Sequence, residues 1–219
     1  MVTAMVVNVT KGPNRPRRRT ARVPRSRAEW IGRVVLAVFT AALAYATISF
    51  TLAGALRGDP GRAYALAPYD GRNTARLAAA LSGPESSSDD RKRSDVLARA
   101  ALRQGPASVV AASVLGINAQ VYGDVAVARR AFTYAEQLSR RDLLTQLWAI
   151  EYAVSQGDVE GALRHYDIAL RIKPAMWELL FPVLAAAASQ NAIQQELVTT
   201  LASRPPWADG FINYAAGNT

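Results

Sequence analysis

Side chains that could carry out catalysis are few and scattered in this chain. Its 219 residues include one histidine and no cysteine, which excludes thiolate chemistry, and no HExxH, P-loop, GxGxxG or GxSxG motif occurs. The central carboxylates show no pairing that would distinguish a general acid from a general base. These carboxylates are Asp142, Glu151, Asp158, Glu160 and Asp167. We therefore predict a protein that is not an enzyme and needs no cofactor or metal, with carboxylates that cap helices or face solvent and with His165 on the surface.

The segments that carry these residues form a repeat. A unit of about 34 residues occurs twice, at 109–142 and 143–176. Seven pairs of positions are identical at this offset, and Phe132 matches Tyr166. The identical pairs are Ala119/Ala153, Gly123/Gly157, Asp124/Asp158, Val125/Val159, Ala128/Ala162, Arg130/Arg164 and Ala135/Ala169.

Each copy of the repeat is predicted to be a pair of helices. In the second copy the first helix runs over 143–156 and the second over 159–172. Gly157 can end a helix because glycine tolerates positive φ, and Asp158 can cap the helix that follows. Pro174 stops the second helix. The paired alanines allow neighbouring helices to approach closely.

This repeat resembles the tetratricopeptide repeat, which has the same period and recurrent Leu-Gly, Ala-x3-Phe and Pro positions. The matching residues are Leu115-Gly116, Ala128 and Phe132 in the first copy and Ala162, Tyr166 and Pro174 in the second. The departures are Ala112 and Gln146 at the family's Trp position, Ala149-Ile150 for Leu-Gly, and Arg140 for Pro. The resemblance implies an all-α fold, a right-handed α-solenoid of three to four helix pairs. A generic bundle of helical hairpins is the alternative.

A 23-residue apolar stretch precedes the repeats. Residues 34–56 carry no charge and span about 35 Å as a helix, enough to cross the ~30 Å hydrocarbon core of a bilayer. Trp30, Arg33 and Arg57 flank the stretch as interfacial anchors would. We predict a single transmembrane helix that serves as a signal-anchor. A cleaved signal peptide is the alternative, since Ala53-Gly54-Ala55 offers a small-x-small cleavage pattern.

Most of the net charge lies before this stretch. Of the formal charge of +9, residues 1–33 hold nine basic and one acidic residue, or +8, which leaves +1 for the rest. We predict a disordered tail whose charge keeps the N-terminus in the cytoplasm, contacts anionic lipid, and places the repeats in the periplasm or an equivalent compartment. The tail is less suited to nucleic-acid binding, because its arginines have no aromatic residues between them. It is also unlike a twin-arginine export signal, because its arginines lie far from the apolar stretch.

The predicted organisation follows from these features. It comprises a basic tail (1–33), a transmembrane helix (34–56), a linker with a short helix (57–74), a degenerate repeat (75–108), two repeats (109–142 and 143–176) and a C-terminal helix pair with a tail (177–219). Repeat arrays need a polar outer face at their ends, and the end of this chain, 215–219, has no charged capping helix. The sequence leaves open that the array continues, is covered by a partner, or ends in a frayed segment.

The resemblance also implies where a partner would bind. First helices of such arrays line a concave groove, which suits a peptide or helix of a partner protein. The groove positions are Val110, Ser113, Ile117, Gln120, Val121, Leu144, Leu147, Glu151, Val154 and Ser155. Burial between repeats is the alternative for these positions. We predict a membrane-anchored scaffold for a bacterial envelope, secretion or polysaccharide assembly; the rivals are a small-molecule or glycan binding module using Trp148, Trp177 and Trp207, and a non-catalytic subunit of a membrane enzyme complex.

Overall fold

The computed structural model describes residues 27–56 and 58–217, and every regular element in this part of the chain is a helix. This confirms the predicted all-α class. The chain divides into two compact units, residues 1–45 and residues 46–219, with the boundary inside the first helix. The predictions for the basic tail before residue 27 and for Arg57 lie outside the described residues.

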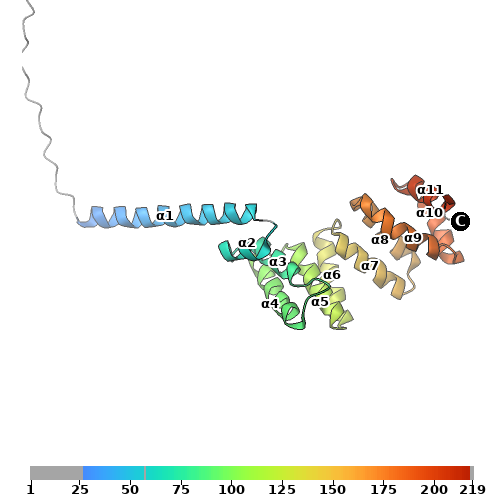
Figure 1. Ribbon diagram of the computed structural model, residues 1–219, viewed down its shortest axis with the longest axis horizontal. Coiled ribbons are helices and arrows are strands. Elements are labelled where there is room, and N and C mark those ends of the chain that lie inside the picture. The colour runs from blue at the N-terminus through green and yellow to red at the C-terminus, as the bar shows by residue number, and fades with distance from the viewer. Residues whose placement is uncertain (1–26, 57, 218–219) are drawn as a thin grey trace, which may run out of the picture. The chain divides into compact units, whose positions relative to one another are not determined.

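Helix α1, Arg27–Ala55, begins the described part of the chain (Figure 1). Its apolar portion, Trp30–Ala55, has 26 residues, roughly 39 Å of helix. Among the described helices, α1 is the one whose length and composition suit a membrane crossing. The hydroxyl groups of Thr40 and Thr51 each donate to a carbonyl oxygen one turn earlier, at 2.8 Å, so these polar groups are satisfied within the helix itself. Trp30 and Arg33, the predicted flanking residues, lie in its first turns and are exposed.

The second unit is a succession of packed helices (Figure 1). After the short α2, Pro60–Leu66, three antiparallel pairs follow, and each pair packs on the next. The pairs are α3 (Gly71–Ala80) with α4 (Ser88–Gln104), α5 (Val109–Val121) with α6 (Val125–Leu138), and α7 (Leu143–Ser155) with α8 (Val159–Ile172). The boundaries of α7 and α8 agree with the helices predicted from the repeat within one residue.

The turns inside the second and third pairs have the same construction. Gly123 and Gly157 adopt positive φ values of 78° and 72°, the conformation that ends a helix most easily at glycine. The next residue then caps the following helix: Asp124 accepts from the Val127 amide at 3.0 Å, and Asp158 accepts from the Gly161 amide at 2.9 Å. The sequence prediction of a Gly-Asp helix break is therefore confirmed in both copies.

The C-terminal helices are packed differently from the three pairs. They are the 3-10 helix η1 (Pro174–Met176), α9 (Trp177–Ala187), α10 (Asn191–Ala202) and α11 (Ala208–Gly217). Helix α10 packs on α8, and α11 packs on α9. Trp207, immediately before α11, is 1% exposed in the largest core cluster, where it meets the Phe211 ring edge to face. The final helix thus packs against the core through the Trp207 side chain.

Candidate functional site

The structure brings together first-helix residues of the two matching pairs. A shallow cavity of about 210 Å³ opens between α5 and α7, over a floor from α6. We call this surface the α5/α7 groove. Its lining residues are Ile117, Gln120 and Val121 of α5, Phe132 of α6, and Leu144, Leu147, Trp148 and Glu151 of α7. Six of the ten groove positions predicted from the sequence lie in this lining.

Aromatic rings form the floor of the α5/α7 groove. The Phe132 ring, 1% exposed, stacks on Trp148 with centroids 4.6 Å apart, and Trp148 stacks on Tyr152 at 5.0 Å. The indole Nε1 of Trp148 donates to Gln120 Oε1 at 3.3 Å, which ties α7 to α5. The Arg129 guanidinium donates to the Tyr152 hydroxyl at 3.3 Å, and this hydrogen bond raises the pKa of Arg129. The stacked rings of Phe132 and Trp148 thus make an apolar floor for the groove.

The other predicted groove residues lie elsewhere. Ser113 is 2% exposed, and its hydroxyl bonds to Asp142 Oδ2 at 2.9 Å, so it belongs to the junction between α5 and α7. Val110 is exposed outside the lining. Val154 lies three residues after Glu151 on the same face of α7, and it lines a neighbouring pocket instead.

This neighbouring pocket is almost wholly apolar. It has a volume of about 320 Å³ and lies among α7, α8, α9 and α10; we call it the α7–α10 pocket. Its lining residues are Val154, Gly157, Val159, Ala162, Leu163, Tyr166, Val183, Leu184, Ala187, Gln190 and Ile193. Tyr166 is its one ionisable residue, and burial raises the pKa of that hydroxyl. The pocket therefore suits apolar groups.

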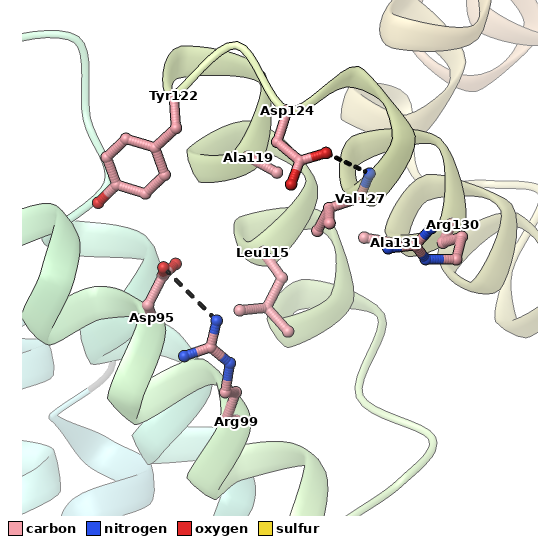
Figure 2. Close-up of a pocket in the computed structure, with 9 residues that line it drawn as sticks. All are labelled: Asp95, Arg99, Leu115, Ala119, Tyr122, Asp124, Val127, Arg130 and Ala131. Carbon is pink, nitrogen blue, oxygen red and sulfur yellow. Dashed lines mark hydrogen bonds and ion pairs between the residues drawn. The ribbon is translucent and has the colours of Figure 1, made fainter.

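A third pocket, about 430 Å³, lies between the first and second pairs (Figure 2). Figure 2 shows Leu115, Ala119 and Val127 between charged side chains from α4 and α6. Asp95 and Arg99 form an ion pair at 3.8 Å, and Asn118 donates to Asp95 Oδ1 at 2.8 Å. The other lining residues are Tyr122, Asp124, Arg130 and Ala131. Both carboxylates are already bonded within the protein, so the pocket lacks a free anionic group that could orient a ligand.

His165 is not the surface residue that the sequence predicts. It is 8% exposed, and its Nδ1 lies 2.7 Å from Gln146 Oε1 and 3.9 Å from Glu136 Oε1. Desolvation lowers its pKa below the usual value, as does Arg164, whereas Glu136 and Asp158 raise it. The prediction is wrong because His165 lies on the face of α8 that packs against α7. The histidine therefore belongs to the junction between α6, α7 and α8.

Two of the three tryptophans considered for ligand stacking are committed elsewhere. Trp207 is buried, and its Nε1 donates to Asp167 Oδ1 at 2.8 Å. Trp177 stacks on Phe181 at 5.6 Å, and its Nε1 is buried without a hydrogen-bond partner among the described residues. Trp148 is partly exposed in the α5/α7 groove. Trp177 is also partly exposed, but of the three only Trp148 lines the α5/α7 groove.

Sequence reasoning missed several buried polar residues that bond to neighbouring helices and loops. Asn118 and Gln146 are 0% exposed, and Arg91 is 8% exposed with its guanidinium donating to carbonyl oxygens near Gly83. A polar residue within an apolar helix was the available signal, since Asn118 lies in a charge-free segment. Within the described ranges, no group of His, Asp or Glu side chains is arranged to hold a metal ion.

No protein-family model matches the chain, and no curated protein matches it.

Proposed function

We propose that this chain is a membrane-anchored scaffold of the tetratricopeptide type, whose α5/α7 groove binds a peptide or helix of a partner protein. In this proposal α1 is the anchor, the N-terminus is cytoplasmic, and the helix pairs form a right-handed solenoid on the far side of a bacterial inner membrane. The setting would be the assembly of an envelope, secretion or polysaccharide system. The chain itself would carry out no chemistry.

One observation supports this proposal most strongly. Residues of two successive first helices, Ile117 on α5 and Leu144 and Leu147 on α7, line one accessible apolar cavity. Recognition of a helix in a groove uses apolar anchors that enter such a cavity, with polar groups at its edge. The packing of Phe132 against Gly116 supports the family resemblance, because these are two of the residues that carry it.

The proposal is tested by isolating the tagged full-length chain from native membranes. We expect a partner to copurify with the wild type and to be lost from Leu147→Asp, because a carboxylate would enter the apolar lining. Val96→Asp is the matched control, since Val96 is an exposed residue of α4 outside the groove. Retention of the same partner by a folded Leu147→Asp protein would refute binding in the groove.

A binding module for a small apolar ligand is the second candidate. The α7–α10 pocket favours it, because its volume of about 320 Å³ falls within the ~300–1,000 Å³ that ligand pockets span. Ligand addition would then change the tryptophan fluorescence in a saturable manner, and Val183→Trp, which would fill the pocket, should abolish that change. A flat response across apolar ligands and glycans would exclude this function.

A further inference from the structure

Charge is distributed unequally among the helices from α4 to α9. The described helices α5, α7 and α9 carry two charged residues in total, Glu151 and Glu178, and no Lys or Arg. The helices that precede these three in the chain, α4, α6 and α8 in turn, carry charges of both signs. Any charge that a partner meets on α5, α7 and α9 is therefore negative.

Glu151 is placed where this charge matters. It lines the α5/α7 groove and is exposed, and its carboxylate has no hydrogen-bond or ion-pair partner among the described residues. The rest of the lining is apolar apart from Gln120, whose Oε1 already accepts from Trp148. An occupant that covers the groove would remove water from around this carboxylate and strengthen its interaction with a nearby charge.

One face of α7 connects the two apolar cavities. Leu144, Leu147, Glu151 and Val154 follow each other at spacings of three and four residues, so they share that face. The first three line the α5/α7 groove and Val154 lines the α7–α10 pocket, a distance of about 15 Å along the helix. Beyond Val154 lies Val183 of α9, which is 53% exposed. A surface of this length matches roughly three turns of a second helix.

We propose that the occupant is an amphipathic helix of a partner protein with an apolar stripe flanked by Lys or Arg, one of which pairs with Glu151. This inference rests on the proposed function and names its partner class. Burial of the apolar stripe supplies most of the binding free energy. The carboxylate supplies selectivity, because a helix flanked by Asp or Glu would place like charges beside Glu151.

The test uses the full-length chain in nanodiscs of phosphatidylcholine, whose headgroup has no net charge, and two labelled peptides of about 15 residues. Both peptides place Leu at positions i, i+3, i+4 and i+7, and the flanking positions are Lys in one and Glu in the other. Fluorescence anisotropy should show the Lys peptide binding about tenfold more tightly. Empty nanodiscs measure binding to lipid alone.

Substitution of Glu151 identifies the source of the preference. Glu151→Lys should weaken the Lys peptide by roughly tenfold and strengthen the Glu peptide, because an attraction becomes a repulsion. Glu196→Lys makes the same charge change on α10, outside both cavities, and should leave the preference intact. Equal binding of both peptides, or an unchanged preference in Glu151→Lys, would overturn the inference.

A third variant separates this inference from the proposed function. If both peptides bind equally and Leu147→Asp abolishes both, the groove binds helices and the proposed basic partner is wrong. If neither peptide binds, the inference fails. If, in addition, the native partner still copurifies with the Leu147→Asp protein, the proposed binding function of the groove is also wrong.

Discussion

The Phe132 ring lies directly against the backbone of Gly116, so that a Cβ at position 116 would stand 2.6 Å from Phe132 Cε2. The two residues belong to α5 and α6, and their contact sets how closely the helices of this pair approach. Phe132 is 1% exposed and stacks on Trp148, and both side chains line the α5/α7 groove. One contact thereby links the packing of a helix pair to the floor of the candidate site.

Gly116→Ala should therefore destabilise the protein. In an exposed helix this change would stabilise by about 1 kcal/mol, but here the added methyl displaces a ring that is packed on both sides, at a cost of roughly 1–3 kcal/mol. We expect a net loss of up to about 2 kcal/mol in urea unfolding of the full chain in detergent micelles. Gly61→Ala in α2 is the control, where the methyl meets only ordinary contacts. A Gly116→Ala protein as stable as that control would show that the ring moves freely.

Asn118→Ala should also destabilise, for a different reason. The Asn118 side chain donates to Asp95 and Ser94 and accepts from the Ser82 hydroxyl at 2.6 Å, all within the interface between the first two pairs. Its removal takes one hydrogen bond from each of these groups and leaves the Ser82 hydroxyl without a partner among the described residues, which costs about 1–3 kcal/mol. The same unfolding measurement applies, with the exposed Asn213→Ala as the reference. Equal urea midpoints for Asn118→Ala and Asn213→Ala would show that the hydrogen bonds of Asn118 do not stabilise the protein.

Stability should fall on acidification because of His165. Its folded-state pKa is lowered, mainly by desolvation, so the unfolded chain takes up a proton first as the pH decreases. The stabilisation is complete above the unfolded value near 6.5 and is lost progressively below it. His165 is the chain's single histidine, so the difference between wild type and His165→Gln should change between about pH 7.5 and about pH 5.5. Parallel pH profiles for the two proteins would exclude this contribution.

Membrane retention should depend on the apolar surface of α1. Arginine at positions 42 and 46 together should cost about 5–7 kcal/mol of insertion free energy and release the chain from sedimented membranes. The paired substitutions Ala42→Leu and Ala46→Leu are the control and should leave it membrane-bound. The intact mass of the mature protein separates an anchor from a signal peptide, since cleavage after Ala55 would remove the basic tail. A chain that remains in the membrane with both arginines would contradict the anchor.

Local features made the helices of the repeat predictable, whereas packing decided the rest. Gly157-Asp158 and Pro174 act within a few residues, and they correctly predict where α7 ends, to within one residue, and where α8 begins and ends. Burial of Asn118 depends on Ser82, which is 36 residues away, so no local pattern reveals it. His165 was predictable in part, because it lies three residues after Ala162 and four before Ala169, two alanines already expected on a packed face.

The groove residues were also predictable only in part from the sequence. The period of the repeat places Leu144, Leu147 and Glu151 on one face of a helix, and the structure brings them together in one cavity. Ser113 falls on the equivalent face of α5 but lies in the interior, because its hydroxyl meets the cap of α7 at Asp142. A small rotation of a helix about its axis moves a side chain from the groove into the core. The periodicity of the sequence does not resolve such a rotation.

The most direct measurement is site-specific photo-crosslinking in intact native membranes, with a photoreactive residue at position 147 and, as the control, at position 96. We expect one dominant crosslinked protein from position 147, absent from position 96, whose crosslinked peptide contains apolar residues beside Lys or Arg. Diffuse crosslinks of equal intensity from both positions would contradict a partner-binding groove between α5 and α7.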